Sequence, residues 1–247
     1  MATPFNPCIL IPVYNHEGPL PKIMQRLALY KLPCILVDDG SRESCAAVIR
    51  GLAGQYPWAR SIRLGINRGK GGAVKAGILL AKDLGYSHAV QIDADGQHDL
   101  DDLDRFLAAA LENPQAVVTG RPLYDESVPK LRYYARYLTH AWVYINTLSA
   151  AIPDSMCGYR VYPVNACVRL LQSTRLEDRM AFDVEILVRL YWQGLTVVAI
   201  PTRVGYPQDG VSHFRGWEDN VRISLTHAKL FFGMLPRLPK LLARHCQ

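Results

Sequence analysis

The chain of 247 residues lacks the features that identify several large protein classes. No stretch reaches the roughly 20 apolar residues of a membrane-spanning helix, because polar side chains interrupt the nearest candidate, Ala141–Ile152. Met1–Pro7 has no basic and then apolar start, so we expect no signal peptide. No basic stripe with interleaved aromatics and no helix-turn-helix pattern is present, so we expect no nucleic-acid partner.

The cysteines also lack a pattern, since they form no C-x-x-C pair and have no regular spacing. Three of them lie in apolar segments, which favours buried free thiols in a reducing cytosol over disulfides or zinc ligands. The six are Cys8, Cys34, Cys45, Cys157, Cys167 and Cys246.

A length of 247 residues is enough for a substantial core and predicts a single domain. Hydrophobic residues make up 49% of the chain, so we expect no disorder. The net charge is +6, and residues 222–244 contain Lys and Arg but no acidic residue. This excess has two interpretations, solubility alone or attraction to anionic lipid or phosphate.

The first half of the chain alternates short strand-like runs with helical ones. We expect strands at Cys8–Val13, Cys34–Val37, Ser61–Leu64, Val90–Ile92 and Ala116–Thr119. We expect helices at Leu20–Tyr30, Ser44–Leu52, Gly72–Leu84 and Leu100–Leu111. Repeated strand–helix units predict an α/β, Rossmann-like fold with a mostly parallel sheet flanked by helices.

The second half is less regular. We expect helices at Val128–Leu148 and Phe182–Gln193, a loop and short strand at Asp154–Pro163, and a strand at Thr196–Ile200. The chain from Val221 onward is predicted to be helical, with breaks at Pro236 and Pro239. We divide the single domain into a nucleotide-binding half (about 8–120), an acceptor half (about 121–215) and a C-terminal helical segment (about 216–247).

Polar clusters follow four of the predicted strands. Because ligands of parallel sheets bind beyond the carboxyl ends of the strands, these clusters predict one shared site. They are Tyr14–Glu17, Asp38–Ser41, Asn67–Lys70 and Asp93–His98.

Asp93 and Asp95 are the most informative pair, because carboxylates crowded at a strand end repel each other. A divalent cation shared with substrate phosphates would compensate them, although a capped turn is the alternative. The glycine-rich segment Asn67–Gly72 opens a helix and predicts diphosphate contact through Arg68 or Lys70, with a plain loop as the alternative. Asp38–Ser41 predicts a contact to a nucleobase or ribose, or a turn before a helix.

These motifs together resemble the family 2 glycosyltransferases of the GT-A fold, especially the dolichol-phosphate mannosyltransferase and polyprenyl-phosphate glycosyltransferase branch. The likeness covers about residues 8–215 and is carried by Pro12–Glu17, Val37–Ser41, Asn67–Gly71, Asp93–His98, Asp154–Arg160 and Phe182–Ile186. The segment Tyr206–His213 departs from the family pattern, because it lacks an Arg and has His213 where a Lys is usual.

The resemblance implies a role for each matched residue. The nucleotide sugar, of UDP or GDP, would be bound by Pro12, Tyr14, Glu17, Val37, Asp39, Lys70, Asp93, Ala94 and Asp95. Mg²⁺ or Mn²⁺ would be held by Asp93, Asp95 and Gln97, and the acceptor or a phosphate by Arg121, Arg136 and Arg203.

The implied reaction is inverting transfer of a glycosyl group to an acceptor, most simply a lipid phosphate. Such a phosphate is already ionised at neutral pH and needs only positioning, whereas an alcohol would need a base. Asp154 is our first candidate for that base or for orienting the acceptor, and Asp183 is the second. A turn and a helix start are the respective structural alternatives.

The tail, Leu230–Leu235 followed by basic residues, is typical either of a segment on a membrane surface or of a core helix. We expect a cytoplasmic protein, peripheral on the cytoplasmic face of the membrane. Three other functions stay open: a haloacid-dehalogenase-like phosphatase, a sugar nucleotidyltransferase and a non-catalytic nucleotide-sugar-binding module.

Overall fold

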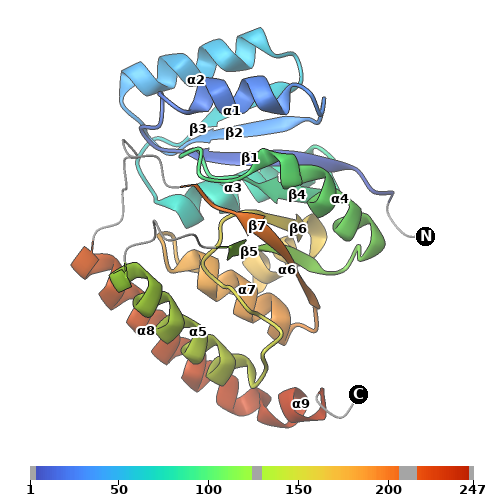
Figure 1. Ribbon diagram of the computed structural model, residues 1–247, viewed down its shortest axis with the longest axis vertical. Helices are drawn as coiled ribbons and strands as arrows, with labels where there is room; N and C mark the ends of the chain where they lie inside the picture. Colours follow the sequence, from blue (N-terminus) through green and yellow to red (C-terminus); the bar gives the residue numbers. More distant parts are fainter. Residues whose placement is uncertain (1–3, 124–129, 206–215, 245–247) are drawn as a thin grey trace.

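A computed structural model describes residues 4–123, 130–205 and 216–244. One mixed, seven-stranded sheet runs through it, in the order β3-β2-β1-β4-β6-β5-β7 (Figure 1). The strands are β1 (Pro7–Val13), β2 (Cys34–Asp38), β3 (Ala59–Arg63), β4 (His88–Gln91), β5 (Val117–Leu123), β6 (Arg160–Pro163) and β7 (Val197–Arg203). The predicted α/β architecture, with a mostly parallel sheet, is confirmed.

Helices cover both faces of the sheet (Figure 1). They are α1 (Leu20–Leu27), α2 (Glu43–Gln55), α3 (Lys70–Asp83), α4 (Leu103–Glu112), α5 (Lys130–Thr147), α6 (Val164–Ser173), α7 (Phe182–Trp192), α8 (Gly216–Met234) and α9 (Leu238–Ala243), with 3-10 turns η1 (Leu100–Asp102) and η2 (Leu235–Arg237). The side chains of α1, α2 and α4 pack in one core cluster, and those of α3, α6 and α7 pack in the other.

The central strand β1 shows why the sequence gives this arrangement. Ile9 and Ile11 face the first cluster, whereas Cys8 and Leu10 face the second, so a strand buried on both faces needs a continuous apolar run. All four are fully buried.

Strand β6 runs antiparallel to both of its neighbours. Its first residue, Arg160, pairs with Gln91 at the end of β4 and with Thr119 in β5. The loop that precedes β6 therefore reaches the same sheet edge as the loop that follows β4. This reversal brings the two predicted halves of the domain together.

The predicted elements are present with shifted ends, and one helix was missed. Strands β5 and β7 continue to Leu123 and Arg203 because they pair with each other over that whole length. Helix α6 was not predicted. Pro236 and Pro239 lie in the first turns of η2 and α9, which confirms the breaks predicted there.

Helix α8 packs one side against the core, since Leu230 and Met234 are buried. None of the helices in the described ranges combines the length and apolar content needed to cross a bilayer. The five cysteines in those ranges are free and buried, as predicted, while Cys246 and Tyr206–His213 lie outside the described residues.

Candidate active site

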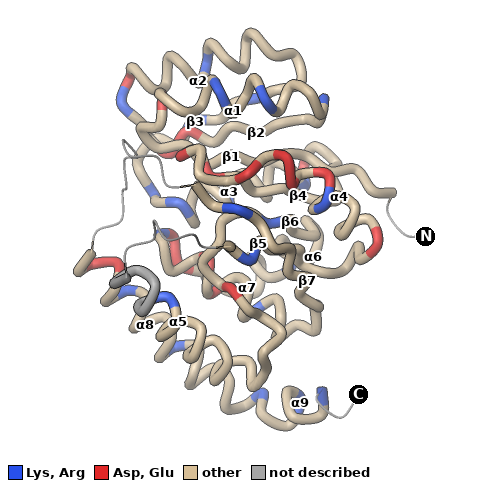
Figure 2. The backbone as a smooth tube through the Cα atoms, viewed as in Figure 1, with Lys and Arg blue, Asp and Glu red and all other residues tan. Residues whose placement is uncertain are grey.

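The four polar clusters lie at one edge of the sheet. Strands β3, β2, β1 and β4 are parallel neighbours, so their carboxyl ends face the same way. Acidic positions gather along the chain from β4 to α4, and basic positions lie near them (Figure 2). The fold therefore brings together side chains that the sequence predicted to share a site.

Asp39, at the end of β2, fixes the loop that opens α3. Its carboxylate accepts hydrogen bonds from the backbone N–H groups of Arg68 and Gly69, both at 2.8 Å, and from Asn67 Nδ2 at 3.0 Å. Gly69 has a φ of +90°, which favours glycine. Burial raises the pKa of Asp39 to about 6, although the N–H donors act in the opposite direction.

The loops after β1 and β2 are also joined by hydrogen bonds. Ser41 donates its N–H to Asp38 at 2.8 Å and accepts from the N–H of Asn15 at 3.1 Å. Glu17 accepts from Arg42 and Ser44, both at 3.2 Å. These bonds tie the loop after β1 to the start of α2.

Of the other predicted nucleotide-binding residues, Tyr14 is half-buried, and Pro12 pairs with Val37 between β1 and β2. The side chains of Val37 and Ala94 are buried in the core.

Lys70 is the centre of the charge network. Its ammonium lies 2.9 Å from Asp93 Oδ2 and 2.8 Å from Asp183 Oδ2, so it joins the loop after β4 to the start of α7. Burial acts to lower the pKa of Lys70, but the Asp183 and Asp93 carboxylates outweigh it and hold that pKa above its ordinary value.

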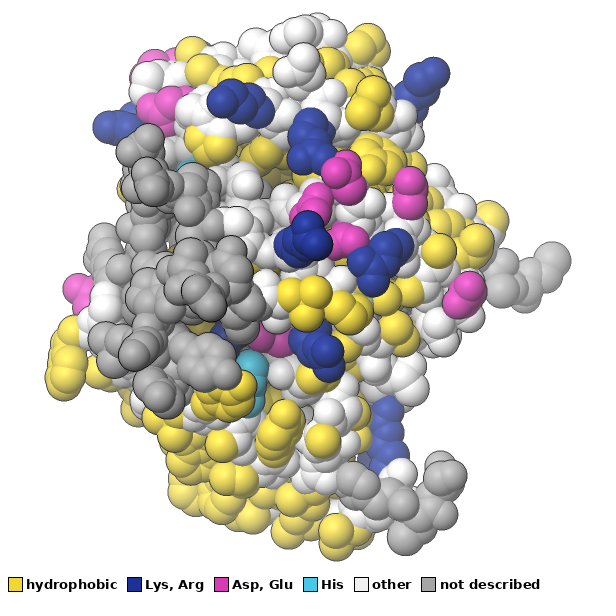
Figure 3. Space-filling view, in the orientation of Figure 1, with side chains coloured by type: hydrophobic (Ala, Val, Ile, Leu, Met, Phe, Trp, Pro, Cys, Tyr) yellow, Lys and Arg dark blue, Asp and Glu magenta, His cyan; other side chains and the backbone are white. Residues whose placement is uncertain are grey.

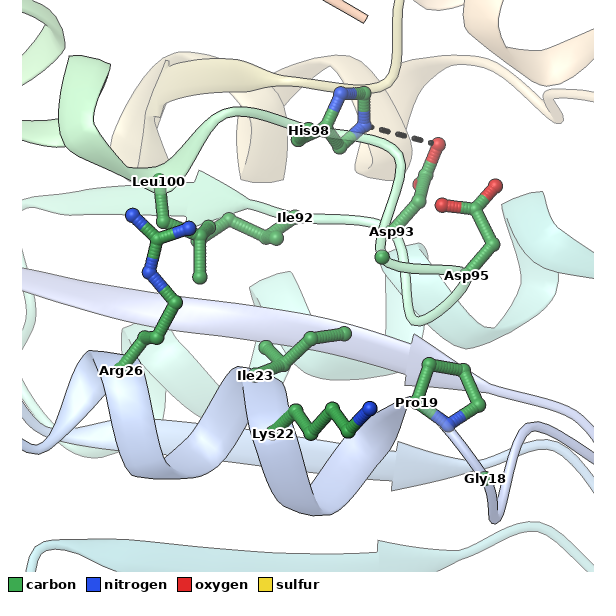
Figure 4. Close-up of a pocket in the computed structure, with 11 residues that line it drawn as sticks. Gly18, Pro19, Lys22, Ile23, Arg26, Ile92, Asp93, Asp95, His98 and Leu100 are labelled. Atoms are coloured by element: carbon green, nitrogen blue, oxygen red, sulfur yellow. Dashed lines mark ion pairs between the residues drawn. The ribbon is translucent and has the colours of Figure 1, made fainter. Parts of the chain in front are cut away.

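Asp93 has further neighbours. Gln91 Nε2 donates to Asp93 Oδ1 at 3.3 Å, and His98 Nε2 lies 3.4 Å from Oδ2 (Figure 4). Burial opposes ionisation of Asp93, but Lys70 outweighs it and keeps the pKa of Asp93 well below its ordinary value. Gly158 lies against this carboxylate, because an added Cβ there would be 2.1 Å from Asp93 Oδ2.

Asp95 lies on the same loop, and its carboxylate is on the same side as that of Asp93 (Figure 4). It accepts the N–H of Gln97 at 3.0 Å. The carbonyl of Gln97 accepts the N–H of Gly205 at 2.9 Å, and His98 forms a bridge with Val204, so the loop is tied to the end of β7.

Beside this loop lies a pocket of about 450 Å³, lined by Asp93, Asp95, one side of α1 and the turn before it (Figure 4). Within the described ranges, no three His, Cys, Asp or Glu side chains converge so as to hold a metal ion by themselves. Asp93 and Asp95 nevertheless offer the hard oxygen ligands that suit Mg²⁺ or Mn²⁺ when a diphosphate and water supply the others.

Asp154, the first candidate base, is 2% exposed and closely surrounded by donors. Arg136 donates to both of its oxygens, at 2.6 and 2.8 Å, and the N–H groups of Met156 and Cys157 donate to Oδ1. His140 Nε2 lies 3.3 Å away. Burial opposes ionisation, but His140 and Arg136 outweigh it and hold the pKa of Asp154 well below its ordinary value.

Arg160 is a residue to which the sequence assigned no role. It is fully buried and donates to the carbonyl oxygens of Asp183 and Ser155, both at 2.6 Å. It thereby fixes the loop beside Asp154 to the start of α7. The sequence did offer one signal for a role of Arg160, namely its place at the end of the Asp154–Arg160 motif.

The three predicted acceptor arginines are only partly brought together. Arg121 and Arg203 are exposed near the ends of β5 and β7, and strand alternation places them on the same face as Arg160. Arg136 comes from α5 and is held by Asp154.

Residues 8–167 match the family described as Glycosyl transferase family 2, and the chain belongs to this family. Membership decides against the phosphatase and nucleotidyltransferase alternatives. It confirms the family resemblance that the motifs indicated.

Among curated proteins, the chain is 28% identical to a dolichyl-phosphate beta-glucosyltransferase of Dictyostelium discoideum, over 72% of this chain and 60% of that protein. It is 30% identical to the Mus musculus protein of that name, over 72% of this chain and 61% of that protein. It is 27% identical to a polyprenol monophosphomannose synthase of Mycolicibacterium smegmatis, over 87% of this chain and 82% of that protein. The chain thus spans about three fifths of the length of the dolichyl-phosphate relatives.

Two solved structures share the fold and confirm the predicted GT-A architecture. Glucosyl-3-phosphoglycerate synthase from Mycobacterium tuberculosis has a TM-score of 0.65 at 15% identity, over 95% of this chain and 80% of that chain. A mannosyltransferase from Pyrobaculum calidifontis, in complex with GDP-Man and Mn²⁺, has a TM-score of 0.60 at 15% identity, over 96% and 73%.

Proposed function

We propose that this chain is an inverting glycosyltransferase that moves a sugar from a UDP- or GDP-sugar to a polyprenyl or dolichyl phosphate. The observation that carries the proposal is the Lys70 ammonium, which joins Asp93 on the predicted donor side to Asp183 on the acceptor side. The relatives named for dolichyl-phosphate and polyprenol products support this acceptor class.

On the donor side, Asp93 and Asp95, with Gln97, would hold Mg²⁺ or Mn²⁺. The bound ion would neutralise charge on the departing diphosphate. The shared orientation of the two carboxylates supports this role (Figure 4). Lys70 would add positive charge beside the diphosphate.

The nucleobase and ribose would lie over the loops after β1 and β2. Asp39 would act there chiefly by holding the backbone of residues 67–69 in place, since its carboxylate already accepts three hydrogen bonds. Tyr14 and Glu17 would contact the nucleotide directly, and Pro12, Val37 and Ala94 would shape the floor of its site.

On the acceptor side, Arg121 and Arg203 would bind the phosphate of the lipid. That phosphate, with a second pKa of about 6, is a ready nucleophile and needs no base. Asp154 would orient Arg136 toward it rather than take a proton, because a carboxylate with a depressed pKa is a weak base. Asp183 would keep Lys70 in place.

A lipid phosphate acceptor would put this chain at a membrane. We therefore propose a peripheral position on the cytoplasmic face, since residues 222–244 carry basic but no acidic side chains.

The proposal is tested by incubating the chain with UDP-glucose or GDP-mannose, Mn²⁺ and polyprenyl phosphate in detergent, with mass spectrometry of the products. We expect a glycosyl lipid phosphate and a free nucleoside diphosphate. Asp95→Ala should lower transfer at least 100-fold with an unchanged melting temperature, whereas the exposed Asp104→Ala should not. Full activity of Asp95→Ala, or release of free phosphate or pyrophosphate, would contradict the proposal.

A further inference from the structure

Helix α5 exposes an unusual surface. Every exposed side chain between residues 137 and 145 is apolar or aromatic, and Leu138 is 65% exposed. The exposed residues are Tyr137, Leu138, Ala141, Trp142, Tyr144 and Ile145. A helix on the surface of a protein in water normally turns charged side chains outward.

Helix α8 exposes a second apolar stripe. Its members recur every three or four residues, so they lie on one side of the helix. They are Trp217, Val221, Leu225, Ala228 and Phe232, of which Trp217 is 83% and Phe232 is 68% exposed. Ile223, Leu230 and Met234 face the core instead.

Helices α5 and α8 lie side by side, so the two stripes are neighbours on the surface (Figure 1). The Trp142 ring lies 6.1 Å from the His227 ring and 6.4 Å from the Phe231 ring, and buried Asn146 hydrogen-bonds His227 at 3.3 Å. Hydrophobic side chains gather over this lower part of the molecule (Figure 3). We call it the α5–α8 face.

The charges near this face indicate which kind of partner suits it. Within residues 216–244 the exposed charged side chains are Glu218 and four basic residues, Arg222, Lys229, Arg237 and Lys240. Two copies joined through this face would bring like charges together, whereas anionic lipid headgroups would complement them. Exposed Trp and Tyr are also typical of the interface between a bilayer and water.

We propose that the α5–α8 face docks on a bilayer that contains anionic lipid. The purpose of this docking rests on the proposed function. Helix α5 also carries Arg136 and His140, which contact Asp154 in the predicted acceptor loop. Docking through α5 and α8 would hold that loop next to phosphates at the membrane surface.

The test is flotation of the full chain with vesicles of phosphatidylcholine containing 30% phosphatidylglycerol. We expect the wild type to bind, and Leu225→Glu/Phe232→Glu to bind at least tenfold more weakly. A matched control, Leu79→Glu/Leu111→Glu, makes the same change at exposed leucines on α3 and α4 and should bind like the wild type.

Equal binding by both double variants, or no binding by the wild type, would overturn the docking surface. So would a dimer in sedimentation equilibrium that only Leu225→Glu/Phe232→Glu dissociates, because the face would then be an interface between copies. Transfer to a detergent-dispersed acceptor should survive Leu225→Glu/Phe232→Glu. Absence of transfer in a wild type that floats with vesicles would count against the proposed function and leave the docking surface intact.

Discussion

Gly158 lies directly against the carboxylate of Asp93, and a methyl group on Gly158 would start 2.1 Å from Asp93 Oδ2. The loop before β6 and the loop after β4 therefore touch through a residue without a side chain. The contact explains why a glycine is needed at position 158, two residues before Arg160.

Gly158→Ala should displace Asp93 and weaken Mn²⁺-dependent binding of the nucleotide at least tenfold, measured by titration calorimetry. Gly51→Ala is the control, because nothing lies within 4 Å of a Cβ at that position in α2. That control should keep its affinity and gain about 0.5–1 kcal/mol of stability, as expected for glycine replaced in a helix. Unchanged affinity in Gly158→Ala would mean that the contact is unimportant.

Lys70→Met should leave Asp93 and Asp183 without the ammonium that bridges them. Breaking a buried ion pair costs about 3–5 kcal/mol, measured by urea unfolding near pH 7. The repelling carboxylates should share a proton, so the variant should become more stable as the pH is lowered from 8 to 5. In the wild type the depressed pKa of Asp93 gives stability that is lost as the pH falls below about 4.

Lys82→Met is the control for this substitution, because Lys82 makes an exposed hydrogen bond to Asn165. Its stability should stay within about 0.5 kcal/mol of the wild type. A similar small change in Lys70→Met would contradict the central role of Lys70.

Asp39 should make stability fall as the pH rises from 4 to 7. Its folded pKa of about 6 lies above the unfolded value of 3.8, so its contribution is fully present below pH 3.8 and is lost through pH 6. A shift of this size corresponds to about 3 kcal/mol. The measurement is the difference in unfolding free energy between wild type and Asp39→Asn across this pH range. A difference that does not change with pH would contradict the prediction.

Arg136→Ala should leave the buried Asp154 carboxylate without its main partner and cost about 3–5 kcal/mol of stability. Arg42→Ala removes the exposed pair with Glu17 and should cost no more than about 1 kcal/mol. The stability losses of the two variants are compared by thermal unfolding beside the wild type. Equal small losses would show that Asp154 does not depend on Arg136.

The sequence predicted the sheet, and the gathering of four polar clusters at one of its edges, because both depend on local pattern. The apolar run of β1 and the spacing of Asp93 and Asp95 are visible within a few residues. The partners of Lys70 and Asp154 were not predictable, since Asp183 and Arg136 reach them only through tertiary packing. Helix α6 was missed because it begins directly after β6, without a capping side chain that marks its start.

The direction of β6 separates two kinds of change that can occur during divergence of such proteins. Strands β1 to β4 carry the predicted donor loops at their carboxyl ends, whereas the predicted acceptor loop enters β6 at its amino end. Insertions ahead of Asp154 would therefore change the surface of the predicted acceptor loop while the contact of Gly158 with Asp93 is kept. Such a change would alter the predicted acceptor side and leave the predicted donor loops in place.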